Sequence, residues 1–157
     1  SRDALEYLQD NLRILSGFYG ILKPLDGVVP YRLEMQSKFI NYKNKDLYEY
    51  WSDKIANSLF EETNLIINLA SKEYSKCVEK YLENSPETKF ITCVFGEIKG
   101  DKVIEKGTLA KMARGEMVRY LAQNKICDLE GLKRFDKLEY KYSQEKSNEK
   151  TYVFIKS

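Results

Sequence analysis

Histidine is absent from all 157 residues of the sequence. It is the commonest general base among catalytic side chains and the commonest metal ligand in proteins. This chain alone therefore cannot form a Ser-His-Asp triad or a histidine-ligated zinc centre. We predict neither a metal site nor a cofactor.

Cysteine and long apolar runs are also scarce. Cys77, Cys93 and Cys127 are odd in number and widely spaced, without a CxxC pair, which favours reduced thiols over disulfides or a zinc site. No apolar run approaches the roughly 20 residues of a membrane span, and no signal-peptide pattern opens the sequence. Together with 32% charged residues and a mean hydropathy of −0.54, these features predict a cytosolic protein without a membrane partner.

The net charge of +2 is nearly neutral, but the positive charge is unevenly distributed. Residues 99–125 contain only three acidic residues. Their seven basic residues are Lys99, Lys102, Lys106, Lys111, Arg114, Arg119 and Lys125. A local basic surface attracts polyanions while the rest of the chain stays balanced.

The pattern of apolar residues mixes helices with strands. Helical spacing predicts helices near residues 3–15, 47–60, 72–82, 108–124 and 129–135. Strands are predicted at residues 65–69, 138–142 and 151–155, with a further hairpin that turns at Gly100-Asp101. We therefore predict an α+β fold in a single domain, residues 1–157, built from helices and β-hairpins.

The segment LSGFYGIL places Gly17, Phe18, Tyr19 and Gly20 directly after the first predicted helix. Such a segment resembles a helix-hairpin-helix, which binds DNA phosphates through backbone amides without reading bases. The usual spacing is Gly-x-Gly, however, and Pro24 leaves room for only about one turn of a second helix. The alternative is a buried corner between two core elements.

The predicted helix at residues 108–124 carries the basic cluster. Lys111 and Arg114 are three residues apart and share a face, whereas Arg119 lies about 140° round the helix from Arg114. Gly115 costs a helix interior about 1 kcal/mol relative to alanine, which indicates close approach of another element or of a ligand. The alternative is an ordinary solvated face with a packing glycine.

Two further segments contain polar candidates. Asn68, Ser71 and Glu73 surround a predicted strand-to-helix turn, where free amides and the helix dipole favour an anion. An ordinary turn with a serine cap explains the same pattern. In PYRLEM, Arg32 and Glu34 alternate with apolar residues, so they form either a structural ion pair or part of a site.

The chain resembles the YaaA-like family of bacterial proteins, a domain of unknown function. The motifs that carry the resemblance occur in the family's order: LSGFYGILKPLD, VPYRLEM, DLYEYWSDKI, INLASKEYSKCV and AKMARGEMVRYL. Similarity continues through GLKRFDKLEYKY to the last strand, although Gln36 and Ser52 stand where the family commonly has glycine. Because the family is longer at its N-terminus, we expect a C-terminal fragment that self-associates through uncovered apolar surface.

The resemblance implies a cytosolic protein of the peroxide stress response that helps limit intracellular free iron. Members are associated with DNA binding through a positively charged cleft and a helix-hairpin-helix-like element, and no established catalytic activity comes with the family. The candidates for binding DNA phosphates are then Gly17, Phe18, Tyr19, Gly20, Lys23, Arg32, Lys111, Arg114, Gly115 and Arg119.

The alternative function is an uncharacterised enzyme that acts on a nucleic acid or nucleotide. In that case Glu34 or Glu73 would serve as acid or base, in a polar pocket with Asn68 and Ser71, and Lys111 with Arg114 would hold phosphate. Direct iron binding is poorly supported, because the chain has no histidine and no clustered cysteines.

Overall fold

The computed structural model describes residues 1–38 and 44–157 and confirms the α+β class. The chain, predicted as a single domain, divides into two compact units. Residues 1–8, 67–69 and 90–157 form the first unit, and residues 9–66 and 70–89 form the second.

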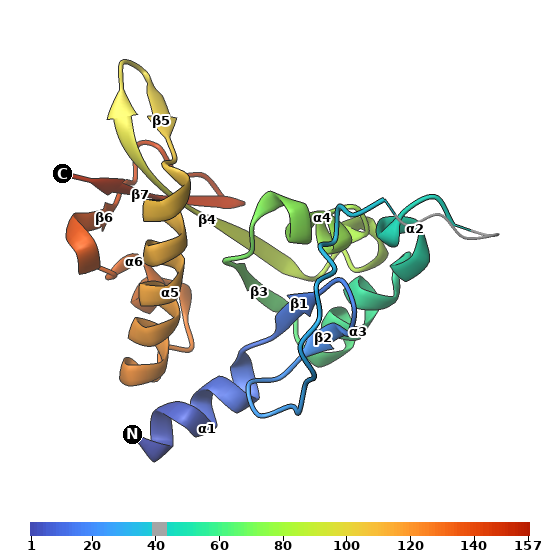
Figure 1. The fold of residues 1–157 in the computed structure, drawn as a ribbon. Coiled ribbons are helices and arrows are strands. Elements are labelled where there is room, and N and C mark those ends of the chain that lie inside the picture. The colour runs from blue at the N-terminus through green and yellow to red at the C-terminus, as the bar shows by residue number, and fades with distance from the viewer. Residues whose placement is uncertain (39–43) are drawn as a thin grey trace. The chain divides into compact units, whose positions relative to one another are not determined.

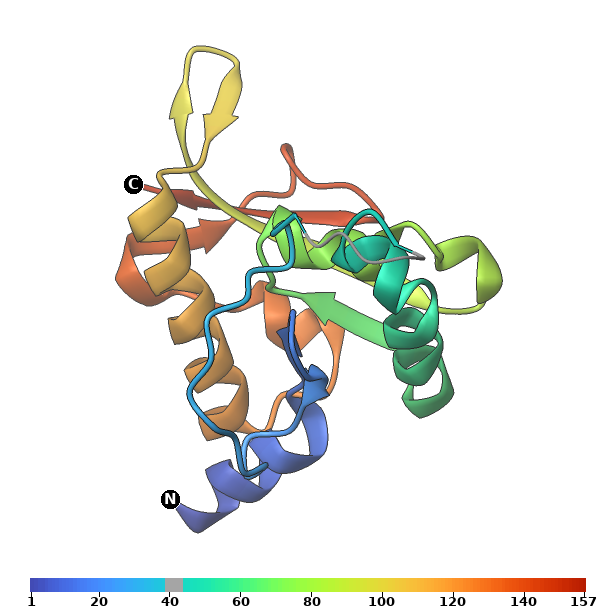
Figure 2. The same cartoon turned by 45° about the vertical axis from the view of Figure 1, so that its right-hand side comes forward.

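The first unit is built on a mixed sheet (Figures 1 and 2). The strands β3 (Leu65–Asn68), β4 (Lys89–Lys99), β7 (Thr151–Lys156) and β6 (Tyr140–Tyr142) are hydrogen-bonded in that order, and β5 (Lys102–Ile104) pairs with β4. Of β3 and β4, the first unit holds the residues from Ile67 and from Phe90 onward. β4 and β7 are parallel, with Thr92 opposite Thr151 and Gly96 opposite Ile155. The β4–β5 and β6–β7 pairs are antiparallel hairpins.

Helices and 3-10 turns complete the first unit. They are the first part of α1 (Arg2–Asn11), α5 (Gly107–Asn124), α6 (Leu129–Lys133) and η2 (Lys137–Glu139). The predicted turn at Gly100-Asp101 is confirmed, because Lys99 pairs with Lys102 and Gly100 has a φ of +62°. Both views show this hairpin projecting beyond the start of α5 (Figures 1 and 2).

An aromatic cluster fills the core of the first unit. The ring of Phe95 on β4 stacks on Phe154 of β7 at 5.1 Å between centroids. Phe95 also makes edge contacts with Phe135 and with Tyr140 of β6. Tyr120 of α5 meets Phe135 at 5.5 Å, so the cluster fixes α5 to the sheet. Aromatic pairs of this geometry stabilise a fold beyond their buried area.

The second unit contains a small hairpin and three helices. Its elements are β1 (Ile14–Ser16), β2 (Gly20–Leu22), α2 (Leu47–Trp51), α3 (Lys54–Glu62), α4 (Lys72–Glu79) and η1 (Leu82–Asn84). Its buried apolar side chains are Met35, Leu47, Ile55, Ala56, Leu59, Cys77 and Val78. The helices α3 and α4 pack against one another around this core.

The predicted helix at residues 3–15 ends earlier, at Asn11. Arg13 forms an ion pair with Glu62 of α3, and this hydrogen-bonded partner lowers the pKa of the Glu62 carboxyl. The next residues enter β1, which pairs antiparallel with β2. Contacts distant in sequence therefore override the local helical spacing.

The helix-hairpin-helix-like element differs from the prediction in its form. Its hairpin is the β1–β2 pair, and residues 23–38 contain no helix that follows it. Pro24 and Pro30 each lack an amide donor, so helical hydrogen bonding cannot continue through this stretch.

The predicted helix at residues 47–60 is interrupted at Ser52. This residue ends α2 with φ +48° and ψ −130°, and Asp53 precedes α3. Positive φ is costly for residues with a side chain and easy for glycine. Glycine would therefore suit the local backbone at this position better than Ser52 does. Gln36, the other departure, does not have a positive φ.

We predict that Ser52→Gly stabilises the chain. Relief of the strained φ outweighs the extra unfolded-state entropy of glycine, so the free energy of unfolding should rise by about 0.5–2 kcal/mol in urea denaturation. The control is Ser58→Gly inside α3, which should lower it by roughly 0.5 kcal/mol. Equal losses for both variants would contradict the strained backbone at residue 52.

Candidate functional site

The amides of the predicted phosphate hairpin are largely engaged within the chain. Phe18 and Tyr19 donate their backbone N–H groups to Oγ of Ser16, at 3.2 and 2.9 Å. Ile21 donates to the carbonyl oxygen of Tyr19 at 3.1 Å. At least three of the four amides from residue 18 to residue 21 therefore already have acceptors, so the hairpin presents no row of free donors.

Packing within the second unit explains why both positions of the hairpin are occupied by glycine. A Cβ on Gly17 would lie 2.7 Å from the carbonyl oxygen of Leu33, so the two backbones approach too closely for a side chain. Gly20 has a φ of +77°, and a Cβ there would lie 2.8 Å from the indole ring of Trp51. Trp51 also donates its indole N–H to the carbonyl oxygen of Gly17 at 2.9 Å. This geometry is that of a packed corner.

The aromatic residues of the hairpin form a cluster with Tyr31. Phe18 stacks on Tyr31 at 5.4 Å, and Tyr19 meets both rings edge-on. The Tyr31 hydroxyl shares a 2.6 Å hydrogen bond with Oγ of Ser16. Phe18 is 53% exposed, so part of its ring is open to a stacking partner.

The other candidates of the second unit lie on the surface. Lys23 and Arg32 are exposed, and neither forms an ion pair with a carboxylate in residues 1–38 or 44–157. The ion pair between Arg32 and Glu34 is therefore not formed. Leu25, Val28 and Val29 are also exposed, which gives this stretch an apolar surface. Self-association stays a prediction.

Arg114 of α5 is held inside the first unit. Its Nη2 donates to Glu105 at 3.2 Å, and the same carboxylate oxygen accepts the amide of Phe95 at 3.3 Å. The Arg114 side chain is only 20% exposed, and its Nε is buried without a hydrogen-bond partner in the described part of the chain. The sequence did not indicate Glu105 as the partner of Arg114.

The exposed face of α5 carries Lys111, Gly115 and Arg119. These residues are four apart in sequence, so they lie next to one another on one face of the helix. All three are exposed. Among residues 1–38 and 44–157, no atom beyond the adjacent helix backbone lies within 4 Å of a Cβ built on Gly115. Arg119 contacts Glu116 at 3.7 Å and stays 67% exposed, so its charge is available to solvent.

The predicted polar pocket is divided between the two units. Asn68 belongs to the first unit and donates to Thr92 Oγ1 at 3.2 Å. In the second unit, Ser71 is the N-cap of α4 but makes no side-chain capping bond. The Glu73 carboxylate accepts the amide of Gln36 at 3.2 Å, and Glu34 is exposed.

The buried cysteines are poor nucleophiles near neutral pH. Burial raises the pKa of the Cys77 thiol to about 11 and that of Cys93 to about 12. The thiolate is the reactive form, and it is scarce at such pKa values. Cys127 is exposed, and its Sγ donates to the carbonyl oxygen of Lys125 at 3.4 Å.

Residues 1–38 and 44–157 contain no group of three or more His, Cys, Asp or Glu side chains that could hold a metal ion. None of the helices in these ranges is both long enough and apolar enough to cross a bilayer.

Comparison with known proteins identifies the family. The family described as "Peroxide stress protein YaaA" matches residues 1–146. UPF0246 proteins of Lachnoclostridium phytofermentans, Agathobacter rectalis and Desulfitobacterium hafniense are 59%, 56% and 52% identical to this chain. These alignments cover 99%, 95% and 99% of the chain.

The family match and these identities show that the chain is a member of a bacterial protein family. It belongs to the peroxide stress protein YaaA family, which confirms the resemblance. The chain spans 60%, 59% and 61% of the length of these three relatives.

We predict that Gly20→Ala destabilises the chain without a specific effect on ligand binding. The left-handed φ costs a residue with a side chain about 1–2 kcal/mol, and contact with Trp51 adds to this loss. Urea denaturation measures the effect. Gly27→Ala is the control, because a Cβ at this exposed position meets no atom within 4 Å. A stable Gly20→Ala variant with weakened DNA binding would instead favour a phosphate-binding hairpin.

Proposed function

We propose that this chain binds DNA through the exposed face of α5 formed by Lys111, Gly115 and Arg119. It does so as part of a cytosolic protein of the peroxide stress response that helps limit free iron. Membership of the peroxide stress family supports the biological setting. The arrangement of the three residues on α5 supports the mode of binding.

The observation that carries the proposal is the environment of Gly115. It lies in the interior of an 18-residue helix, where glycine costs about 1 kcal/mol relative to alanine. Its φ is not positive, and no described atom comes within 4 Å of its missing side chain. Nothing in the described part of the chain therefore requires glycine here. Close approach of an external backbone would favour glycine at this position, and the charges of Lys111 and Arg119 would favour an anionic backbone.

The surrounding charges favour a polyanion. Lys99, Lys102 and Lys111 are exposed, and no carboxylate of the described chain lies within ion-pair distance of them. Lys99 and Lys102 form the end of the β4–β5 hairpin, which projects beyond the start of α5 (Figures 1 and 2). DNA carries regularly spaced phosphates, and each contact with lysine or arginine releases a bound counterion. Such contacts position a protein on DNA without reading its sequence.

We propose that the effect on free iron is indirect. The described residues contain no cluster of metal-binding side chains, so none of them is assigned as an iron ligand. The buried thiols of Cys77 and Cys93 have raised pKa values, so the proposal also assigns them no reaction with peroxide. Protection of DNA is the role that α5 supports.

Replacement of Lys111 and Arg119 by alanine should weaken binding to all duplex sequences alike. Two lost phosphate contacts should flatten the slope of log K against log salt by up to ~1.8. Fluorescence anisotropy with a labelled duplex, repeated over a series of salt concentrations, measures this slope.

Lys150→Ala is the matched control for charge, because Lys150 is exposed in the same unit but lies between β6 and β7. It should leave the slope nearly unchanged. A double variant that folds normally and keeps the original slope would remove the α5 face from the DNA interface.

A further inference from the structure

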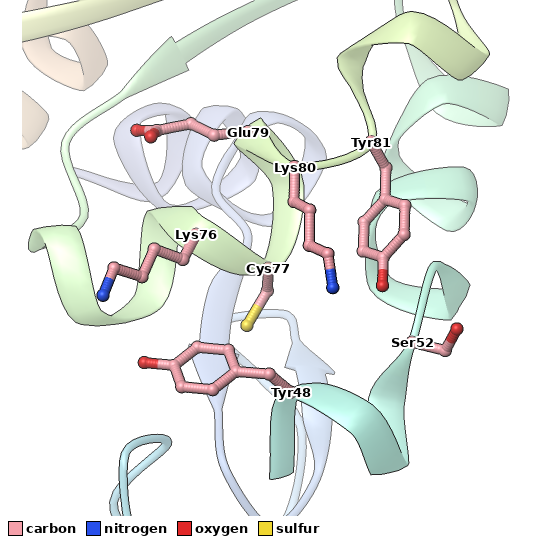
Figure 3. Close-up of a pocket in the computed structure, with 7 residues that line it drawn as sticks. All are labelled: Tyr48, Ser52, Lys76, Cys77, Glu79, Lys80 and Tyr81. Carbon is pink, nitrogen blue, oxygen red and sulfur yellow. The ribbon is translucent and has the colours of Figure 1, made fainter. Parts of the chain in front are cut away.

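A cavity of about 480 Å³ lies in the second unit, and the proposed DNA contacts do not use it. This volume is within the usual range for small-molecule sites, roughly 300–1,000 Å³. Its walls come from α2, from α4 and from the chain that follows each helix (Figure 3). The lining residues are Tyr48, Ser52, Lys76, Cys77, Glu79, Lys80 and Tyr81.

Two tyrosine rings and two lysines dominate the cavity. Lys76 Nζ lies 6.0 Å from the ring centroid of Tyr48, and Lys80 Nζ lies 5.5 Å from that of Tyr81. The two lysines are four residues apart in sequence, and Figure 3 shows their ammonium groups on opposite sides of Cys77. Figure 3 shows the Lys80 ammonium between the two rings, with Cys77 facing Tyr48.

The lining of the cavity carries two positive charges and one negative charge. Neither Lys76 nor Lys80 forms an ion pair with a described carboxylate, and both are exposed. Glu79 is the single carboxylate among the seven lining residues, and its side chain points away from both rings (Figure 3). The Cys77 thiol is neutral near pH 7, because burial raises its pKa to about 11. The cavity thus joins flat aromatic walls and a neutral floor to two cations.

A ligand that matches all of these features has a flat ring and an attached anion. Bases stack on tyrosine rings whatever their sequence, because every base has a π-face. Lysine binds phosphate as a point charge. We propose that this cavity binds a nucleoside 5′-phosphate, with its base stacked on Tyr81 and its phosphate attracted by the ammonium groups of Lys80 and Lys76.

The proposal goes beyond the DNA contacts of α5, because it assigns a separate site in the other unit. The ligand is either a free nucleotide or an unpaired nucleotide of a DNA strand, since the two share this chemistry. Experiments on the 157-residue chain with thymidine 5′-monophosphate, thymidine, inorganic phosphate and a single-stranded thymidine oligonucleotide distinguish these sources.

Isothermal titration calorimetry should show tighter binding of thymidine 5′-monophosphate than of thymidine or inorganic phosphate alone. Tyr81→Leu should weaken it by about 5- to 150-fold through lost stacking, whereas Tyr81→Phe should retain it. The double variant Lys76→Gln/Lys80→Gln should weaken binding of the nucleotide and leave binding of thymidine unchanged. Thermal melting followed by circular dichroism checks that each variant is folded.

Lys54→Gln is the matched control. Lys54 Nζ lies 5.8 Å from the ring centroid of Tyr50, which is a similar lysine–tyrosine pair in the same unit but outside the cavity. This variant should bind the nucleotide normally. Equal binding by folded Tyr81→Leu and the unaltered chain would overturn the proposal.

The oligonucleotide separates this site from the α5 face. If the nucleotide belongs to a strand, the lysine double variant should flatten the salt slope for the single strand by up to ~1.4 and spare the duplex. If the lysine double variant weakens binding of the mononucleotide only, the ligand is a free nucleotide. If the α5 variant weakens all DNA binding while the cavity variants change neither ligand, the cavity proposal fails and the DNA-binding function stands.

Discussion

The parallel pairing of β4 with β7 is the interaction on which the first unit depends. It places Phe95 directly opposite Phe154 in the ladder, and the two rings stack. Phe135 then packs against both rings, and Tyr120 of α5 packs against Phe135. The orientation of α5 is therefore a consequence of a strand pairing between residues about sixty positions apart in sequence.

A second tether fixes the beginning of α5 to the same sheet. Glu105 receives a hydrogen bond from Arg114 and another from the amide of Phe95. Arg114 thus holds the helix to β4, and this role explains why so basic a residue is mostly shielded from solvent. Because Arg114 is used inside the unit, the outward charge of the helix comes from Lys111 and Arg119.

The second unit depends on Trp51 in a comparable way. Its indole ring covers Gly20, and its N–H binds the carbonyl oxygen of Gly17. The conspicuous glycines of the sequence are therefore explained by packing, whereas the inconspicuous Gly115 has no such explanation. The family resemblance indicated the first pair, whereas the geometry indicates Gly115 in the interior of α5.

Local sequence patterns predicted the elements better than their partners. The hairpin at Gly100-Asp101, the strand β3 and the long helix α5 follow from turn residues and apolar spacing. The parallel pairing of β4 with β7 has no local signal, because its partners meet only after a long crossover. The break at Ser52 could not be predicted from apolar spacing. The helical spacing of apolar residues continues across Ser52, whereas the helical backbone stops there.

The candidate sites show the same limit. Charge and spacing indicated the basic helix, and the exposure of Lys111, Gly115 and Arg119 agrees with a surface role. The sequence did not indicate that Arg114 is the arginine held inside the unit. Its partner Glu105 lies nine residues away, before α5 begins. The cavity also needs tertiary structure: the spacing of Lys76 and Lys80 is visible in the sequence, but the approach of Tyr48 from α2 is not.

The most direct test of the DNA-binding account is Gly115→Ala, with stability and duplex affinity measured on the same protein. Alanine is the better helix former, and its Cβ would have no neighbour within 4 Å in the described residues beyond the adjacent helix backbone, so the free energy of unfolding should rise by about 0.5–1 kcal/mol. The added methyl group should obstruct the DNA backbone, so affinity should fall although no charge is lost. A stabilised variant with unchanged affinity would contradict the account.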